Sequence, residues 1–229
     1  MRFIEKTSSP PTLEQWKIDR KAIGQSCTYG DLSGQPQNDL KTTLLAEQKS
    51  LCGYCQQVIL NGSSTVEHFL PQAKFKLHEV DYLNLHLVCK CSRGLKANDT
   101  YCDVRKGNDL VINAILHPDC ESFFRYTKNG EIIPNDSSYS NFEAFEKNLN
   151  KLTLKNHSIF HLIKVLNLNS PNLVAKRKKQ TNDVLTLVRS LNTKAKVDAY
   201  IAKEDAKPKS IRFPSLIKYY LQLHRNNLK

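Results

Sequence analysis

Clustered cysteines constrain the fold of this chain more than any other feature of its sequence. Cys52 and Cys55 stand at C-x-x-C spacing, and Cys89, Cys91 and Cys102 follow tens of residues later. Two thiolates at this spacing can bind one tetrahedral metal ion, and a second group of cysteines can complete its four ligands. The total of seven cysteines is odd, and most fall in one segment, which disfavours a framework of disulfides. The pattern therefore predicts a compact unit built around a metal ion.

Two other interpretations of these cysteines remain open at this point. A lone C-x-x-C pair also occurs in thiol redox proteins, so Cys52 and Cys55 by themselves would fit a redox role. Several buried free cysteines without a metal would give the same pattern. The additional cysteines and the absence of an alternating βαβ pattern disfavour the redox interpretation.

The chain carries a large excess of positive charge. It has 34 Lys and Arg against 22 Asp and Glu, a formal net charge of +12 and a pI near 9.3. Such an excess favours a polyanionic partner, because each neutralised phosphate releases counterions, although anionic membranes and acidic proteins attract basic chains too. The first residues lack the apolar core of a secretory signal, and no run approaches the roughly 18 apolar residues of a membrane span. We therefore expect a soluble, cytoplasmic protein that binds nucleic acid.

Acidic, histidine and amide residues lie among the cysteines. Glu67 and His68 are adjacent, Asn84 follows, and Asp103 and Lys106 come just after the last of the clustered cysteines. Hydrolysis of a phosphodiester requires an activated water and a cation that offsets the charge growing on the phosphate. A histidine near neutrality can take the proton, and a hard divalent ion with oxygen ligands supplies the cation. A lone histidine more often packs structurally, but this setting among cysteine pairs indicates a catalytic site.

The order of these residues resembles the HNH nuclease finger. That finger is a β-hairpin followed by a helix, which grips one catalytic divalent ion, and in many members a four-cysteine zinc holds the motif rigid. The resemblance implies a zinc ion bound by four thiolates, those of Cys52, Cys55, Cys89 and Cys102. Cys89 stands where such fingers place the third thiolate, at the end of the second strand. An insertion over residues 90–101 separates the last two ligands, so Cys91 stays open as the alternative to Cys89.

The same resemblance implies the catalytic roles. His68 takes the position of the general base, and Glu67 and Asp103 take those of ligands to a catalytic Mg²⁺ or Mn²⁺. Asn84 matches the central asparagine, which pins a long loop and orients the base. Lys106 is expected to meet a phosphate at the cleavage site. Family members more often carry Asp before this histidine, so Glu67, which is one methylene longer, is a departure from the pattern.

Short elements are predicted within the finger and just before it. Leucines at helical spacing predict a helix that ends near Gln48, after a loop-like run over residues 29–38. Asn61-Gly62 supplies the positive φ angles of a tight turn and predicts a hairpin over residues 58–66. Further elements expected here are an irregular loop at 69–83 and a strand at 85–88.

The rest of the chain is predicted to be helical. The expected helices begin at a capping box of Ser140 and Glu143, cover Ile159–Leu168, run from Ser170-Pro171 to about Leu191, and cover Ile211–Leu223. The basic run Lys176–Lys179 is either a solvated helix face or a strip that tracks phosphates. The fold class is therefore α+β, with a metal-bound finger inside a mainly helical scaffold. The segments are a lead-in (1–50), the finger (51–110) and a helical region (111–229) packed with it as one domain.

Longer segments resemble one group of nucleases. Met1–Lys6, Leu51–Cys55, Val66–Pro71, Tyr101–Gly107 and Val165–Asn169 look like the HNH effector of Septu and retron-associated anti-phage systems. The resemblance implies a role in phage defence and an ABC-type ATPase partner that controls the nuclease. DNA is favoured over RNA as the substrate.

The competing interpretation is a zinc-ribbon module that binds nucleic acid without catalysis. Such a module needs no oxygen-rich metal site beside its zinc, so Glu67, His68 and Asp103 favour the nuclease. His86 lies on the predicted second strand near the site and could contact substrate, but a surface or packing role is expected.

Overall fold

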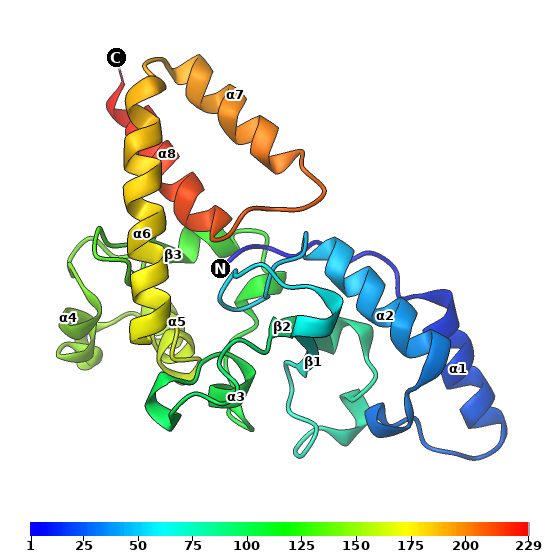
Figure 1. Ribbon diagram of the computed structural model, residues 1–229. Helices are drawn as coiled ribbons and strands as arrows, with labels where there is room; N and C mark the ends of the chain where they lie inside the picture. The colour runs from blue at the N-terminus through cyan, green and yellow to red at the C-terminus, as the bar shows by residue number, and fades with distance from the viewer. Residues whose placement is uncertain (229) are drawn as a thin grey trace.

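The computed structural model describes residues 1–228 and shows two small β-hairpins within a helical framework (Figure 1). The helices are α1 (Pro11–Ala22), α2 (Gly34–Glu47), α3 (Asp103–Lys106), α4 (Phe142–Glu146), α5 (Leu154–Val165), α6 (Pro171–Leu187), α7 (Lys194–Asp205) and α8 (Pro214–Asn227). The strands are β1 (Ser64–His68), β2 (Leu85–Cys89), β3 (Phe124–Tyr126) and β4 (Ile132–Pro134). The expected mixture of helices and small sheets is confirmed. Within the described residues, no helix combines the length and the apolar character needed to cross a bilayer.

The first hairpin joins the residues that matter most for chemistry. β1 and β2 pair antiparallel, with Glu67 opposite His86, and α3 follows them in the chain. Adjacent strand residues point to opposite faces, so Glu67 and His68 leave β1 in different directions. The strand predicted at 85–88 is confirmed.

The hairpin predicted over residues 58–66 is wrong. Val58 forms a β-bridge with Leu51, on the other side of the cysteine knuckle, and residues 61–63 form a single 3₁₀ turn. The backbone of the segment after Cys55 is thus used to close the knuckle, so it does not pair with β1. The strand that does pair with β1 arrives only after the intervening loop.

The N-terminal segment is more helical than its sequence suggested. α1 was not predicted, and the loop-like run over residues 29–38 is wrong because α2 begins at Gly34. Gly34, Pro36 and Asn38 are typical of turns. Pro36 nevertheless falls in the first helical turn, where a backbone N–H has no partner within the helix and its absence costs little.

The C-terminal part is not helical throughout. The hairpin of β3 and β4 was not predicted, because three-residue strands are too short to show an alternating pattern, and α7 was not predicted either. The cap of α4 is Asn141, whose side chain accepts from the Ala144 N–H at 2.8 Å, and not Ser140. α5, α6 and α8 correspond to the other predicted helices, but their ends differ. α5 starts and ends earlier than predicted, α6 ends four residues earlier, and α8 is shifted three to four residues toward the C-terminus.

One hydrophobic cluster draws on all three predicted segments. It includes Leu44 from α2, Leu87 from β2, Leu173 from α6 and Leu216 from α8. Met1 is buried in it, and Figure 1 places the N-terminus near the centre of the molecule. The finger is therefore packed into the helical scaffold, which holds its elements in register.

The turn of the second hairpin lies directly on α6. A Cβ added at Gly130 would stand 2.3 Å from the Val174 carbonyl oxygen and 2.6 Å from the Lys178 nitrogen. Arg177, from the basic run, is 2% exposed and donates to the Gly130 carbonyl at 2.7 Å and to the Leu168 carbonyl at 2.6 Å. Arg177 is therefore a structural clamp and does not belong to a phosphate-tracking strip.

Replacing Gly130 by Ala should strongly destabilise the protein. Gly130 has φ +92, so a side chain there is strained as well as in collision with the α6 backbone. We expect a loss of about 3 kcal/mol or more in the free energy of unfolding, measured by chemical denaturation. Gly24→Ala is the matched control, since Gly24 has φ +71 with nothing within 4 Å and should lose only about 1 kcal/mol. Equal losses in the two variants would contradict the packing of this turn on α6.

Candidate metal centre and adjoining acid–histidine site

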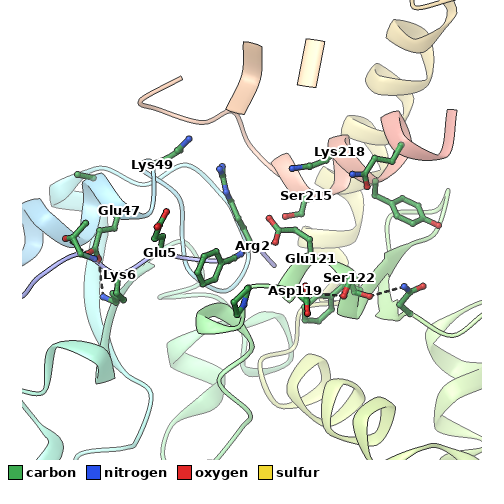
Figure 2. Close-up of a pocket in the computed structure, with 18 of the residues that line it drawn as sticks. Arg2, Glu5, Lys6, Glu47, Lys49, Asp119, Glu121, Ser122, Ser215 and Lys218 are labelled. Carbon is green, nitrogen blue, oxygen red and sulfur yellow. Dashed lines mark hydrogen bonds and ion pairs between the residues drawn. The ribbon is translucent and has the colours of Figure 1, made fainter. Parts of the chain in front are cut away.

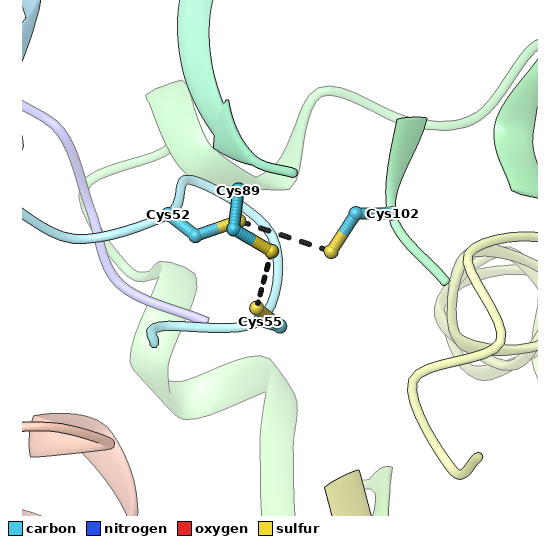
Figure 3. A group of neighbouring side chains, drawn as sticks. All are labelled: Cys52, Cys55, Cys89 and Cys102. Carbon is cyan, nitrogen blue, oxygen red and sulfur yellow. Dashed lines mark hydrogen bonds between the residues drawn. The ribbon is translucent and has the colours of Figure 1, made fainter. Parts of the chain in front are cut away.

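Four cysteine sulfurs gather at one buried point. The Sγ atoms of Cys52, Cys55, Cys89 and Cys102 all lie within 4.8 Å of one another, and Figure 3 shows them turned toward a common centre. Cys91 is exposed and lies outside this group. Burial raises the pKa of the Cys102 thiol well above its usual value, so a compensating cation is needed to collect thiolates here. Four sulfurs so placed suit a tetrahedral metal ion.

Three separate segments supply these sulfurs. Cys52 and Cys55 lie in a knuckle in which the Cys52 N–H donates to the Gln57 carbonyl at 2.9 Å. Cys89 ends β2, and Cys102 directly precedes α3, with its N–H donating to the Leu166 carbonyl at 3.0 Å. A metal bound here would thus join the knuckle, the first hairpin and the start of α3. The hydrogen bond to Leu166, which directly follows α5, ties this unit to the helical scaffold.

Lys106 lies inside the site and is paired with Glu67. Its Nζ is 3.0 Å from Glu67 Oε1 and donates to the His68 carbonyl at 3.0 Å, and its side chain is fully buried. The Tyr54 hydroxyl donates to the same Glu67 oxygen at 3.4 Å. Burial raises the pKa of Glu67, and the neighbouring Lys106 ammonium opposes that rise. The resemblance to the HNH finger implied that Lys106 meets a substrate phosphate, whereas in this structure its ammonium pairs with the Glu67 carboxylate.

His68 is buried beside the hairpin with one ring nitrogen held. Its Nε2 lies 2.9 Å from the Glu79 carbonyl oxygen, and its ring packs edge-on against Tyr29 at 4.8 Å between centroids. Because a carbonyl only accepts, Nε2 carries the proton and Nδ1 keeps a free lone pair. The Gln72 Nε2 atom, 3.2 Å from His68 Nε2, is then a contact between two donors. Burial lowers the pKa of His68, so the ring is neutral at pH 7.

Asn84 ties the two parts of the long loop together. Its Oδ1 accepts from the Leu70 N–H at 2.6 Å, and its Nδ2 donates to the Leu70 and His78 carbonyls at 3.2 and 2.9 Å. Glu79 directly follows His78, so the same amide fixes the carbonyl that holds His68.

Asp103 is half satisfied. Its Oδ2 accepts from Arg93 Nη2 at 2.8 Å, while its Oδ1 is buried and has no hydrogen-bond partner among residues 1–228. A buried carboxylate oxygen without a donor or cation is costly. The negative charge of Asp103 also raises the pKa of Glu67, so the two carboxylates lie close enough to interact electrostatically. An oxygen-rich site with an unused acceptor fits a hard divalent cation.

His86 is a packed core residue. Burial lowers its pKa to about 3, and its ring lies 4.7 Å from that of Tyr54 and 5.6 Å from that of Phe69. A Cβ added at Gly53 would stand only 2.8 Å from the His86 ring, so the knuckle needs glycine at this position. The packing role expected for His86 agrees with this environment.

Several residues around the site were missed by sequence analysis. Tyr54 and Arg93 lie inside the cysteine motif and its insertion, where their positions were a usable signal. Tyr29 and Glu79 carried no signal in the sequence. Tyr29 reaches His68 only through the tertiary fold. Glu79 acts through its backbone carbonyl, which any residue possesses.

A groove with a volume of about 1250 Å³ lies elsewhere, between the N-terminal segment, α2 and α8 (Figure 2). Arg2, Lys49 and Lys218 line it together with Glu5 and Glu121. None of the residues predicted for catalysis lines it, and its mixed charges select no class of ligand. The chemically distinctive site is the one around the first hairpin.

Cys52→Ser should release the metal expected at the cysteine group and destabilise the fold. Binding energy at such a site is folding energy, so we expect the melting temperature to fall by more than about 10 °C. Metal content by mass spectrometry and thermal unfolding measure the two effects. Cys91→Ser is the matched control and should keep both the metal and the melting temperature, because Cys91 is exposed and outside the group. Loss of metal in the control would contradict the ligand set.

Comparison with known proteins adds a distant relative. No protein-family model matches the chain. The chain is 24% identical over 192 residues to the protein named "Retron Vc95 putative HNH endonuclease" of Vibrio cholerae serotype O1 biovar El Tor, an alignment that covers 82% of this chain and 85% of that protein. This similarity supports the resemblance to an HNH endonuclease in a retron context.

Proposed function

We propose that this chain is a metal-dependent HNH endonuclease that hydrolyses phosphodiester bonds of nucleic acid, with DNA favoured. The observation that carries the proposal is a neutral, buried histidine, with one nitrogen held and the other free, adjacent in β1 to Glu67. The half-satisfied Asp103 and the four-cysteine group beside it support the same function. The name of the distant relative supports it independently.

Two metal ions complete the proposed site. Zinc on Cys52, Cys55, Cys89 and Cys102 is structural, since four thiolates close a tetrahedral site and leave no open position for substrate. Glu67 and Asp103 hold a catalytic Mg²⁺ or Mn²⁺, which favours carboxylate oxygens. When bound, such an ion supplies a Lewis acid that offsets charge on the phosphate.

The chain's own residues handle the proton and the geometry. His68 Nδ1 takes a proton from water, and the water oxygen bonds to phosphorus as the bond to the leaving oxygen breaks. The Glu79 carbonyl keeps the other proton on Nε2 and so fixes the reactive tautomer. Asn84 holds the loop that carries this carbonyl. Lys106 fixes both the Glu67 carboxylate and the backbone of His68, and acts as a positioning residue.

The proposed biological role is phage defence in the cytoplasm with an ABC-type ATPase partner, as the resemblance to Septu and retron-associated effectors implies. A free nuclease with a net charge of +12 would bind host DNA readily, so control by a partner is expected. Two exposed apolar residues, Ile18 on α1 at 59% and Ile23 directly after α1 at 69%, are the contacts proposed for that partner.

His68→Ala should abolish cleavage of plasmid DNA while the protein stays folded and keeps its zinc. The melting temperature should fall by a few degrees, because a buried ring and its hydrogen bond to the Glu79 carbonyl are lost. Loss of a general base costs roughly 10²- to 10⁴-fold in rate. Plasmid nicking with Mg²⁺ or Mn²⁺, with and without the ATPase, measures the effect, and a tRNA substrate tests RNA. The control is His157→Ala, since His157 is exposed on α5 and should cleave like wild type. Full cleavage by the His68 variant would contradict the assignment of His68 as the general base of an HNH nuclease. Wild-type protein that binds nucleic acid without cleaving it would favour the zinc-ribbon module.

Ile18→Glu combined with Ile23→Glu should weaken co-purification with an ABC-type ATPase encoded beside this protein. Charge on an apolar docking surface costs desolvation without a partner, and we expect at least a tenfold loss of complex. Deleting residues 1–40 would not test this, because Met1 and Leu13 are core residues. Leu154→Glu, on a leucine 90% exposed at the start of α5, is the control. An unchanged complex in the α1 variant would move the docking surface elsewhere.

A further inference from the structure

The insertion between the last two cysteines is a well-anchored loop. Its first residue, Lys90, donates its N–H to the Ser63 carbonyl at 3.0 Å, and the buried Ser92 hydroxyl donates to the Tyr101 carbonyl at 2.8 Å. On the far side, Asn167 Nδ2 donates to the Thr100 carbonyl at 2.8 Å. Both ends of the loop are thus fixed, and Arg93 directly follows the Ser92 anchor.

Arg93 reaches from this loop to the proposed metal ligand. Its Nη2 donates to Asp103 Oδ2 at 2.8 Å, and its side chain is 48% exposed against 11% for Asp103. A guanidinium has five N–H donors, so most of them still face solvent. The ion pair therefore holds the Arg93 guanidinium at the edge of the site, with N–H donors that are not used by Asp103.

The surroundings of Arg93 are positively charged. Lys90 and Lys96 are exposed on the same loop, Arg105 is exposed on α3, and Asp99 is the one acid in the loop. A phosphate backbone is attracted to such a rim, and the planar fork of arginine matches phosphate oxygens two at a time. Lys106 cannot take this role in the present arrangement, because its ammonium is buried against Glu67.

We propose that Arg93 binds a phosphate of the nucleic-acid substrate beside Asp103, and that its ion pair with Asp103 keeps the guanidinium at the site before substrate arrives. This inference rests on the proposed nuclease function and assigns the substrate contact of the same site. It also makes Arg93 a competitor of the divalent ion for Asp103 in the free protein. Removing Arg93 must then move two binding constants in opposite directions.

The test measures both binding constants on the whole zinc-loaded chain of residues 1–229. Arg93→Ala should bind Mn²⁺ about threefold to tenfold more tightly by calorimetry, because a positive charge beside Asp103 is gone. In the His68→Ala background, the same change should weaken binding of a labelled DNA oligonucleotide roughly tenfold by fluorescence anisotropy. The slope of log affinity against log salt should fall by about one for the lost phosphate contact.

Two further variants separate contact from general charge and from folding. Lys96→Ala removes one cation of the same basic rim that is not paired with Asp103, and so measures the effect of charge alone. It should leave Mn²⁺ affinity unchanged and weaken oligonucleotide binding only about twofold, clearly less than Arg93→Ala. Arg93→Lys keeps the charge without the fork, and should restore Mn²⁺ affinity toward wild type but oligonucleotide affinity only in part.

Opposite shifts in Arg93→Ala, absent in Lys96→Ala, support the inference. Equal oligonucleotide binding by the two variants would overturn it while leaving the nuclease proposal intact. Weaker binding of both Mn²⁺ and oligonucleotide with a lower melting temperature would assign Arg93 a structural role and overturn it too. A wild-type chain that neither binds nor cleaves nucleic acid would overturn the proposed function and, with it, this inference.

Discussion

The rest of the site depends on the meeting of four buried cysteine sulfurs. The short hairpin of β1 and β2 and the single turn of α3 are each too small to be stable alone in water. The sulfurs draw the knuckle, the end of β2 and the start of α3 to one point, and the helical scaffold packs around them. The zinc proposed there would contribute binding free energy of about 10 kcal/mol or more to the folded state.

Charge balance is the second constraint on the site. Two carboxylates, Glu67 and Asp103, are held close enough to influence one another, and each has a basic partner, Lys106 or Arg93. The two partners differ in kind, because Lys106 is buried and fixed by a backbone carbonyl, whereas Arg93 is half exposed on a loop. One pair is thus built into the fold, and the other lies where, on the proposed function, a metal ion and a phosphate would rearrange it.

The parts that sequence predicted well are those carried by local chemistry. Cysteine spacing indicated a metal group, and the resemblance to the HNH finger selected the four sulfurs that the structure brings together. The order of residue types singled out Glu67, His68, Asn84 and Asp103, whose roles stay predictions. The wrong predictions concern segments whose local pattern suggests one structure while their tertiary contacts impose another. Asn61-Gly62 is typical of a hairpin turn, but Val58, just before it, forms a β-bridge with Leu51 and closes the knuckle. The short strands of the second hairpin are fixed by the packing of their turn on α6. This contact leaves no periodic hydrophobic pattern in the sequence from which it could be predicted.

A hydrogen bond joins the cysteine knuckle to the acid–histidine site, in addition to the first hairpin that both use. Tyr54 lies between the two knuckle cysteines, and its hydroxyl donates to Glu67 Oε1. The neighbouring Gly53 N–H donates to the Leu87 carbonyl of β2 at 3.0 Å, and the His86 ring fills the space that its missing side chain leaves. A shift of the knuckle would therefore move both the hydrogen bond to Glu67 and the strand opposite it. On the proposed assignment, the structural zinc helps to position a ligand of the catalytic ion, so loss of the cysteine group would disturb Glu67 through Tyr54 as well as destabilise the fold.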